Sequence, residues 1–413
     1  MIRFFNACFL LATLTGCASY QSRVELARQD LINGQCSQAV AKLSELSAKA
    51  DGDQLVYLME QGTALQTCRQ FKASNAVFLK ADKLSEQLDY HSASRVVGAT
   101  LLNEEMLQYK GDTFEKLFIN ASLALNYLQL GETDDALVEV RRINEKFKKY
   151  NFDEKKKFEL NSFSQYLSGL IWEFDKKYDD ACISYKSAYQ LDPTLKQVGL
   201  DMLRGCWLAH REQEVESLIK KVEPTKEELE LLKKPRQKNK NEVVIIFMQG
   251  LGPRKAPRPE NRIFPRLVSI PSITQSLQVT VDSETSPLKE VSRLVYNVEK
   301  AAIDTLEDDY KSLVARRIGA YAAKEVVADQ IRQKDKTLGT LAWLVMVASE
   351  KADLRQWSLL PKTVQVIRLS LDKSVKKLKL SGLDYSHQVS ENFEDIQIDS
   401  ALAKNIFLIR SLK

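Results

Sequence analysis

Cysteine is the residue type whose positions in this 413-residue chain point most directly to chemistry. Two of the six cysteines lie within the first nineteen residues, and the other four form two well-separated groups. An even number of cysteines in an oxidising compartment is typical of disulfides, so we predict one bond within each group. Four buried free thiols are the alternative. The predicted bonds are Cys36–Cys68 and Cys182–Cys206.

The N-terminus has the pattern of a secretory signal. Arg3 supplies a positive charge, and residues 4–14 form a short apolar run that only Asn6 interrupts. A small residue, Gly16, closes the run just before Cys17. This order of charge, apolar run and small residue is typical of a signal peptide that is removed on export. An ordinary signal peptide that happens to contain a cysteine is one alternative.

The sequence Leu14-Thr15-Gly16-Cys17 resembles a bacterial lipobox. The resemblance implies cleavage before Cys17, which removes residues 1–16 and leaves the sulfur and the new α-amine of Cys17 acylated. Ala18, rather than an acidic residue, follows the cysteine, and this favours the outer membrane. Three acyl chains exceed the two signals that stable anchoring needs. We expect lipidation at Cys17 and an outer-membrane location facing the periplasm.

Bulk properties exclude two classes of protein. The formal net charge is only +5, far below the basic excess of a nucleic-acid-binding protein, so we expect no nucleic-acid partner. After the signal, no apolar run reaches the ~20 residues that span a bilayer. The nearest, residues 338–348, is flanked by Lys336 and Glu350. Membrane attachment is therefore expected through lipid and not through a helix.

The residues that usually carry catalysis are scattered. His91, His210 and His387 have no metal-binding spacing, and no Gly-x-Ser-x-Gly elbow is present. Adjacent acids such as Asp308-Asp309 are usually solvated, whereas general acid–base catalysis needs a desolvated pair in a cleft. We expect no enzyme activity, no metal and no cofactor other than the covalent lipid.

Internal repeats organise residues 17–222. Residues 165–193 match the tetratricopeptide pattern: Gly169 lies where two helices cross, large aromatic residues follow at helical spacing, and Asp192-Pro193 ends the unit. Small residues allow close helix approach and large ones fill the groove between neighbours. Weaker copies lie at 117–145, at 58–84 and around Ala39. A TPR-like helical repeat domain with a concave surface for a partner is predicted.

The pattern changes after residue 222. Residues 223–241 are a charged linker, and residues 242–249 form a continuous β-branched and aromatic run that predicts a buried strand. Further strands are expected near 264–270, 277–281, 363–369, 375–380, 393–398 and 405–410. Helices are expected over 287–328 and 337–353, the second one buried. Residues 242–413 are therefore predicted to form an α+β domain in which strands bracket a helical pair.

A Pro- and Arg-rich loop follows the first strand. Its Gly-x-Gly lacks the Lys-Ser/Thr of a phosphate-binding loop, so nucleotide binding is rejected. One interpretation is an anion-facing patch for lipopolysaccharide, phospholipid or peptidoglycan carboxylates. The other is a solvated, proline-stiffened connection between strands. The basic residues are Arg254, Lys255, Arg258, Arg262 and Arg266.

Several segments together resemble an uncharacterised family of bacterial outer-membrane lipoproteins with tetratricopeptide-like repeats. They are the lipobox, residues 117–144, residues 243–255 and residues 349–371. The resemblance implies an outer-membrane lipoprotein without known catalytic activity, often encoded near lipoproteins that activate peptidoglycan synthases. The residues that mark a helix-to-strand junction of the family are Asp353, Arg355, Trp357, Pro361 and Arg368.

Two hypotheses of function follow. The first is a lipid-anchored, periplasm-facing scaffold for protein interactions in cell-envelope or peptidoglycan assembly. Its repeat groove would bind an envelope protein, and peptidoglycan would be a further partner. The alternative is a glycan- or lipid-binding module that uses the C-terminal domain. Charge-led binding to a glycan should weaken sharply with salt, whereas burial of a partner in a helical groove should not.

Overall fold

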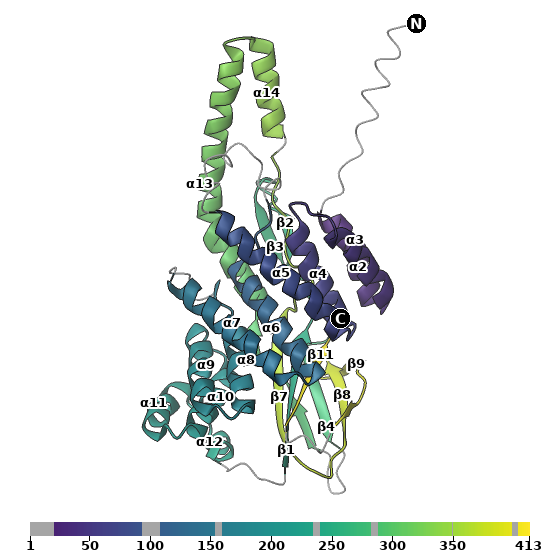
Figure 1. The fold of residues 1–413 in the computed structure, drawn as a ribbon, viewed down its shortest axis with the longest axis vertical. Helices are drawn as coiled ribbons and strands as arrows, with labels where there is room; N and C mark the ends of the chain where they lie inside the picture. Colours follow the sequence, from purple (N-terminus) through teal and green to yellow (C-terminus); the bar gives the residue numbers. More distant parts are fainter. Residues whose placement is uncertain are drawn as a thin grey trace.

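The computed structural model describes residues 20–92, 108–152, 159–233, 240–281, 288–348, 350–398 and 404–413. The predicted signal peptide and Cys17 lie outside these ranges. Antiparallel helix pairs come first along the described chain, and strands that bracket a helical hairpin follow, which is the predicted fold class. Figure 1 shows the helix pairs as one layer beside the strands, with the hairpin projecting from the body.

The repeat region is a TPR-like solenoid in which each helix pair packs on the next. The first helices of the pairs are α2 (Tyr20–Ile32), α4 (Gln54–Thr67), α6 (Thr113–Leu130), α8 (Ser162–Phe174) and α10 (Lys196–Leu208). The second helices are α3 (Cys36–Ser47), α5 (Phe71–Ser92), α7 (Thr133–Phe152), α9 (Tyr178–Leu191) and α11 (Glu212–Val222). A short helix, α12 (Lys226–Lys233), lies within the predicted linker.

Glycine determines how closely the helices of a pair approach. A Cβ atom added at Gly169 of α8 would lie 2.6 Å from the ring of Tyr185 in α9. The same distance separates a Cβ atom at Gly62 of α4 from the ring of Phe78 in α5. Because protein interiors have no room for such an overlap, each ring packs directly against helix backbone. The crossing predicted at Gly169 is confirmed.

The C-terminal region contains two sheets and a ribbon. The first sheet has the strand order β11-β1-β7-β6, with β1 parallel to β11 and antiparallel to β7. Its strands are β1 (Lys240–Gln249), β6 (Arg293–Asn297), β7 (Thr363–Asp372) and β11 (Lys404–Arg410). The second sheet contains β4 (Ser276–Val281), β5 (Leu288–Val291), β8 (Lys377–Leu383), β9 (Val389–Asn392) and β10 (Ile396–Gln397). The ribbon pairs β2 (Arg254–Pro257) with β3 (Pro265–Val268).

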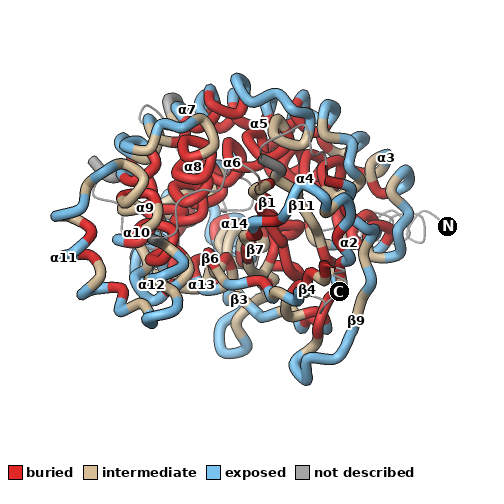
Figure 2. Tube along the Cα trace, turned by 90° about the horizontal axis from the view of Figure 1, so that it is seen from below, coloured by how far each residue is buried: buried red, intermediate tan, exposed pale blue. Residues whose placement is uncertain are grey.

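Strand β1 is buried on both faces, which explains its continuous apolar sequence. Side chains on one face, such as Ile245 and Phe247, pack with Leu277 and Leu380 of the second sheet in the core of a β-sandwich. Side chains on the other face, such as Ile246, belong to the same core as the solenoid helices. Figure 2 shows the consequence: the helices form an arc, and the strands lie inside it.

The helical prediction for residues 287–328 is wrong at its start. Residues 288–297 form β5 and β6, and the helix α13 runs from Val298 to Arg332. The apolar residues there have spacings that suit a helix, but β6 completes the first sheet by pairing with β7. Long-range strand pairing therefore overrides the local pattern.

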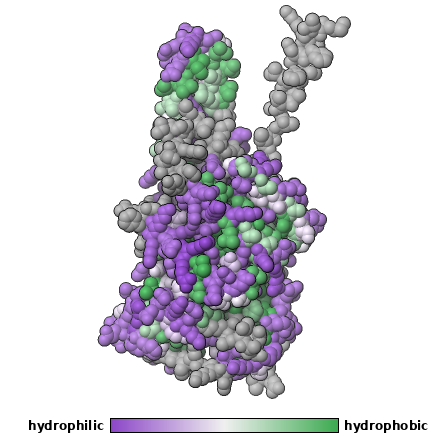
Figure 3. All heavy atoms as spheres, in the orientation of Figure 1, coloured by the Kyte–Doolittle hydropathy of each residue, from purple (hydrophilic) through white to green (hydrophobic). Residues whose placement is uncertain are grey.

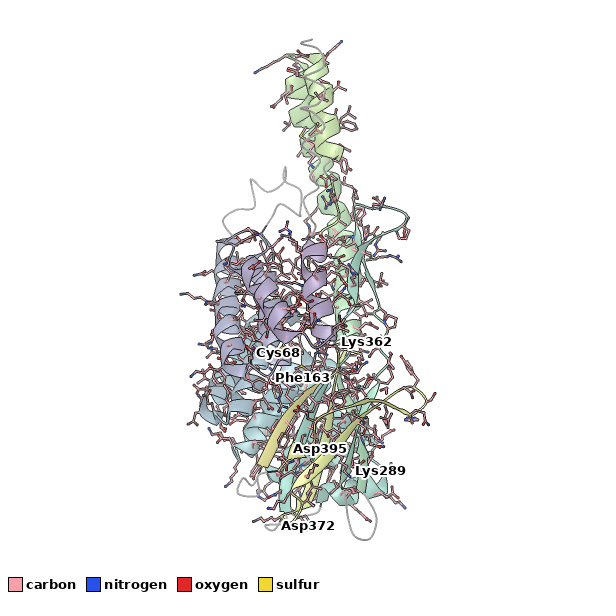
Figure 4. The ribbon with its side chains drawn as sticks, turned by 90° about the vertical axis from the view of Figure 1, so that its right-hand side faces the viewer. Cys68, Phe163, Lys289, Lys362, Asp372 and Asp395 are labelled. Atoms are coloured by element: carbon pink, nitrogen blue, oxygen red, sulfur yellow. A yellow bond between two sulfur atoms is a disulfide. The ribbon has the colours of Figure 1, made fainter. Side chains whose placement is uncertain are left out.

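The helix predicted over 337–353 is α14 (Lys336–Ala348), and the prediction that it is buried is wrong. It packs against α13 to form a hairpin, which extends well beyond the body in Figure 4. Leu341 and Val345 are 56 % and 61 % exposed. Among the described residues, no helix combines the length and the apolar character needed to cross a bilayer.

Candidate functional site

The segment that follows the hairpin and continues into the first half of β7, residues 353–368, is called the junction segment. It runs along the concave face of the solenoid and contains every residue of the predicted family junction. Trp357 is its centre: it is 3 % exposed, and its indole Nε1 donates to Thr63 Oγ1 of α4 over 2.8 Å. Its ring lies 5.8 Å from the ring of Phe78 and 5.9 Å from that of Phe118. The tryptophan therefore seals the junction against two helix pairs.

Glu60 of α4 holds the backbone that follows Trp357. Its carboxylate is fully buried and accepts the amide N–H groups of Ser358, at 2.6 Å, and Leu359, at 3.1 Å. The hydroxyl of Tyr20 in α2 donates to the same carboxylate over 2.6 Å. Burial raises the pKa of Glu60, and these donors oppose that rise. The carboxylate is a fixed acceptor for the turn of the junction segment at Ser358 and Leu359.

Glu115 of α6 also holds the backbone of the junction segment, at the amide of Trp357. Its Oε1 accepts the Trp357 amide over 3.0 Å, and its Oε2 accepts the Tyr109 hydroxyl and the Asp112 amide. Burial, together with the nearby Asp112 carboxylate, raises the pKa of Glu115 to about 7. The Asp112–Glu115 pair is also the capping box that begins α6. One side chain thus caps a solenoid helix and holds the junction segment.

Arg355 and Asp353 form the predicted ion pair, with Nη2 2.7 Å from Oδ2. Arg355 also reaches Asp53 Oδ1, at the start of α4, over 3.1 Å. Burial opposes ionisation of Asp353, but Arg355 outweighs it and lowers the pKa of the carboxyl. The pair therefore joins the junction segment to the solenoid.

Arg368 of β7 reaches two fully enclosed carboxylates of the solenoid. Its Nη2 lies 2.8 Å from Glu173 Oε1 of α8, and its Nη1 lies 3.0 Å from Asp201 Oδ1 of α10. The hydroxyls of Tyr185 and Tyr166 donate to the same two carboxylates over 2.8 Å each. Pro361, the remaining residue of the predicted motif, is buried where the segment turns into β7.

The sequence analysis missed the acidic partners on the solenoid: Glu60, Glu115, Glu173 and Asp201. A signal was present, because each lies in the first helix of a repeat, among residues that are otherwise mostly apolar. An acid inside such a helix must find a donor or cation. Here the donors come from residues 357–368 of the same chain. The concave face is therefore occupied by the chain itself and is not open to the partner predicted for it.

The five basic residues predicted to face an anion lie on or near the β2–β3 ribbon and have different surroundings. Arg254 lies 3.5 Å from Glu25 of α2, and Lys255 donates to the Arg355 carbonyl over 3.0 Å. The guanidinium of Arg258 lies 4.2 Å from the centre of the Tyr310 ring. Arg262 and Arg266 are exposed. The first three help to hold the ribbon, and the last two face solvent.

The four cysteines from Cys36 onward form the predicted bonds, Cys36–Cys68 and Cys182–Cys206. The first joins α3 to the end of α4, and the second joins α9 to α10. Each bond therefore links neighbouring helix pairs of the solenoid. Cys182 and Cys206 are completely buried, whereas Cys36 and Cys68 are half-buried.

An open groove lies on the solenoid between α9 and α11. Its volume is about 850 Å³, and Met202 of α10 contributes to its apolar lining together with Tyr189 and Leu218. Lys186 and Lys221 line it as well. The groove is separate from the concave face, so it stays accessible when the junction segment is in place. Within the described ranges, no three His, Cys, Asp or Glu side chains are grouped so that they could hold a metal ion.

No protein-family model matches the sequence, and neither does any curated protein. Solved structures of repeat proteins are similar to about half of the chain. One is a putative kinesin light chain with nearly identical TPR-like repeats from Podosopora anserina, with 14 % identity and a TM-score of 0.35 over 52 % of this chain and 97 % of that one. Another is MamA from Desulfovibrio magneticus RS-1, with 15 % identity and a TM-score of 0.33 over 53 % and 100 % of the two chains.

Proposed function

We propose that this protein is a lipid-anchored, periplasm-facing scaffold for protein interactions at the outer membrane. The lipobox-like sequence supports acylation of Cys17, and the two disulfides suit an oxidising compartment. The observation that carries the scaffold role is the occupied concave face. Because Arg368 of the sandwich pairs with both Glu173 and Asp201 of the solenoid, these contacts join the two regions into one platform.

The groove between α9 and α11 is the surface we assign to a protein partner. Its floor is apolar, through Tyr189, Met202 and Leu218. Lys221 lies beside it, as does Lys186, which pairs with Glu214 of the same lining. Such a surface suits an amphipathic segment that buries apolar residues and carries acidic ones at its edge. The family resemblance makes peptidoglycan assembly the process in which we would first look for that partner.

A second candidate function is glycan or lipid recognition by the C-terminal domain. Arg262 and Arg266 favour it, because both are exposed near the same ribbon, where an anionic headgroup or carboxylate could reach them. Binding of this kind should fall steeply as salt is raised, since exposed charges are screened over about 10 Å at 0.1 M salt.

Site-specific photo-crosslinking in living cells tests the proposal. A photoreactive residue replaces Ser217, which is exposed and lines the groove, and the matched control replaces Glu216, its exposed neighbour outside the lining. We expect one dominant envelope protein to be captured from position 217 and not from 216. A truncation that removes residues 243–413 would not replace this experiment, because it would leave the buried carboxylates of the solenoid without their partners.

Two further results test the lipid anchor and the second candidate function. Mass spectrometry of the mature N-terminal peptide should find an acylated Cys17, and an unmodified residue 17 would refute the anchor. If position 217 captures no protein, and salt-sensitive glycan or lipid is instead recovered with the wild type but not with an Arg262→Ala/Arg266→Ala variant, the second candidate function replaces the first.

A further inference from the structure

Helix α14 has the composition of a buried helix and the exposure of a surface one. From Thr337 to Ser349 the sequence contains no charged residue. Leu338, Leu341, Leu344 and Val345 are nevertheless between 52 % and 61 % exposed. Together they form an exposed apolar patch, and large patches of this kind on soluble proteins mark sites of interaction. A helix that is apolar on all sides is normally covered, so the composition of α14 implies a cover.

The exposed apolar surface continues onto α13. Ile318 and Val326 are 65 % and 59 % exposed. Lys324 of the same helix is buried instead and reaches the Met346 carbonyl of α14 over 3.3 Å. We call these six side chains the apolar belt: Ile318, Val326, Leu338, Leu341, Leu344 and Val345. Figure 3 shows its α14 part as a green surface directly beneath the polar tip of the hairpin.

Several charged groups of the hairpin are paired with one another. Arg317 and Lys324 of α13 both contact the Glu350 carboxylate, and all three are buried. Glu325 and Asp329 both pair with Arg332 near the tip. Paired charges cost less to bring into a medium of low dielectric constant than isolated ones. The distal hairpin therefore suits a contact with an apolar environment on more than one side.

We propose that the apolar belt contacts the lipid bilayer, at the boundary between headgroups and acyl chains. This rests on the acylation of Cys17 proposed above. Cys17 precedes Tyr20 by three residues, which can span about 11 Å at most. Tyr20 donates to the Gln356 carbonyl over 2.6 Å, and Gln21 donates to the Leu354 carbonyl over 3.3 Å. The lipid must therefore enter the membrane close to the base of the hairpin.

The tip of the hairpin carries the second argument for lipid. Lys334 and Lys336 are exposed on either side of the turn, next to the apolar belt. Long lysine side chains can keep their ammonium groups at the level of lipid phosphates while the neighbouring apolar residues lie deeper. A single partner helix would cover one side of the hairpin, whereas the belt extends over both helices. A bilayer is the occupant that fits both features.

Trp343 of α14 offers a native probe. The full-length acylated protein is reconstituted into vesicles of phosphatidylethanolamine and phosphatidylglycerol, with or without bromine on the acyl chains. We expect bromine to quench part of the tryptophan emission, and Trp343→Phe to abolish that part, because Trp172, Trp207 and Trp357 lie in the body. Leu341→Glu should reduce the quenching at least twofold. Val389→Glu, at a position 58 % exposed on β9, is the matched control and should leave it unchanged.

The outcomes separate this proposal from the anchor. Protein that floats with the vesicles but shows no quenching overturns the hairpin contact and leaves the anchor intact. Unquenched emission together with a doubled particle mass in detergent would show that a second copy covers the belt. Crosslinking of position 341 to another protein would overturn the proposal as well. A protein that does not float at all contradicts both the anchor and the bilayer contact.

Discussion

Arg368 of β7 lies 2.8 Å from Glu173 of α8, across a contact that joins residues 195 positions apart in the chain. A TPR-like concave face usually receives a partner, and here it receives the C-terminal domain of the same chain. The pair explains why the two regions behave as one body. It also moves the search for partners from the concave face to the outer groove and the hairpin.

Replacing Arg368 with Met should destabilise the protein strongly. The change removes the cation that pairs with the buried Asp201 and leaves the buried Glu173 with one cation fewer, since Arg204 remains 3.3 Å away. Removing one partner of a buried ion pair costs about 3–5 kcal/mol. Urea denaturation of the full chain measures the loss. Arg69→Met is the control, because Arg69 and Glu394 form an exposed pair between the same two regions, worth less than about 1 kcal/mol. Equal losses in the two variants would disprove the importance of the buried pair.

The free energy of unfolding should fall as pH rises from about 4.5 to about 7, because Glu115 titrates between these values. Its pKa is about 7 in the folded protein and near 4.5 in the unfolded chain, so the folded state binds the proton more tightly. This contribution to the free energy of unfolding is complete below pH 4.5 and is lost by about pH 7. Its full size is up to about 3 kcal/mol.

The measurement is the urea midpoint at pH 5.0 and pH 7.5 for the wild type and for Glu115→Gln, which cannot titrate. We expect the variant to be less stable overall, because an amide cannot accept all of the hydrogen bonds that Glu115 accepts. Its midpoint should nevertheless depend less on pH than that of the wild type. The same pH dependence in both proteins would mean that Glu115 is ionised throughout.

Local features were predictable from the sequence, and contacts between distant segments were not. The Gly169 crossing, both disulfides and the buried strand at 242–249 each follow from a short pattern of residue types. No such pattern predicts which segment occupies the concave face, because Glu60 and Ser358 are 298 positions apart and no repeat or period relates them. The segment that resembles a family junction contains the right residues, but only the fold showed that they face the solenoid.

The hairpin is a second feature that the sequence alone did not predict correctly. Residues 338–348 predict a buried helix, since composition reports what a side chain needs and not what surrounds it. Similarly, residues 288–297 have a helix-like spacing of apolar residues, but pairing with β4 and β7 decides their conformation. The strands that decide the conformation of residues 288–297 are remote in the chain or adjacent only in the fold. The surface that we propose to cover α14 is not part of the chain.

The two disulfides should differ in their resistance to reduction. Cys36 and Cys68 are half-buried, so a phosphine reductant can reach their bond in the folded protein. Cys182 and Cys206 are completely buried and should stay oxidised until the solenoid opens. Alkylation after mild reduction, followed by peptide mass mapping, should label Cys36 and Cys68 first. Reduction in denaturant should label all four cysteines. Labelling of all four at the same time without denaturant would contradict the burial of Cys182 and Cys206.

Alanine at Gly169 should destabilise the solenoid, because its Cβ atom would lie 2.6 Å from the Tyr185 ring. That ring also packs against Gly205 and donates to Glu173, so it cannot move without disturbing the contact with Arg368. We expect a loss of about 1–3 kcal/mol, the usual cost of overpacking a core. Gly319→Ala is the matched control. It lies within α13 with no atom within 4 Å of the added Cβ, so it should stabilise the protein by up to about 1 kcal/mol. Opposite signs in thermal denaturation would show that close packing, and not helix propensity, requires glycine at position 169.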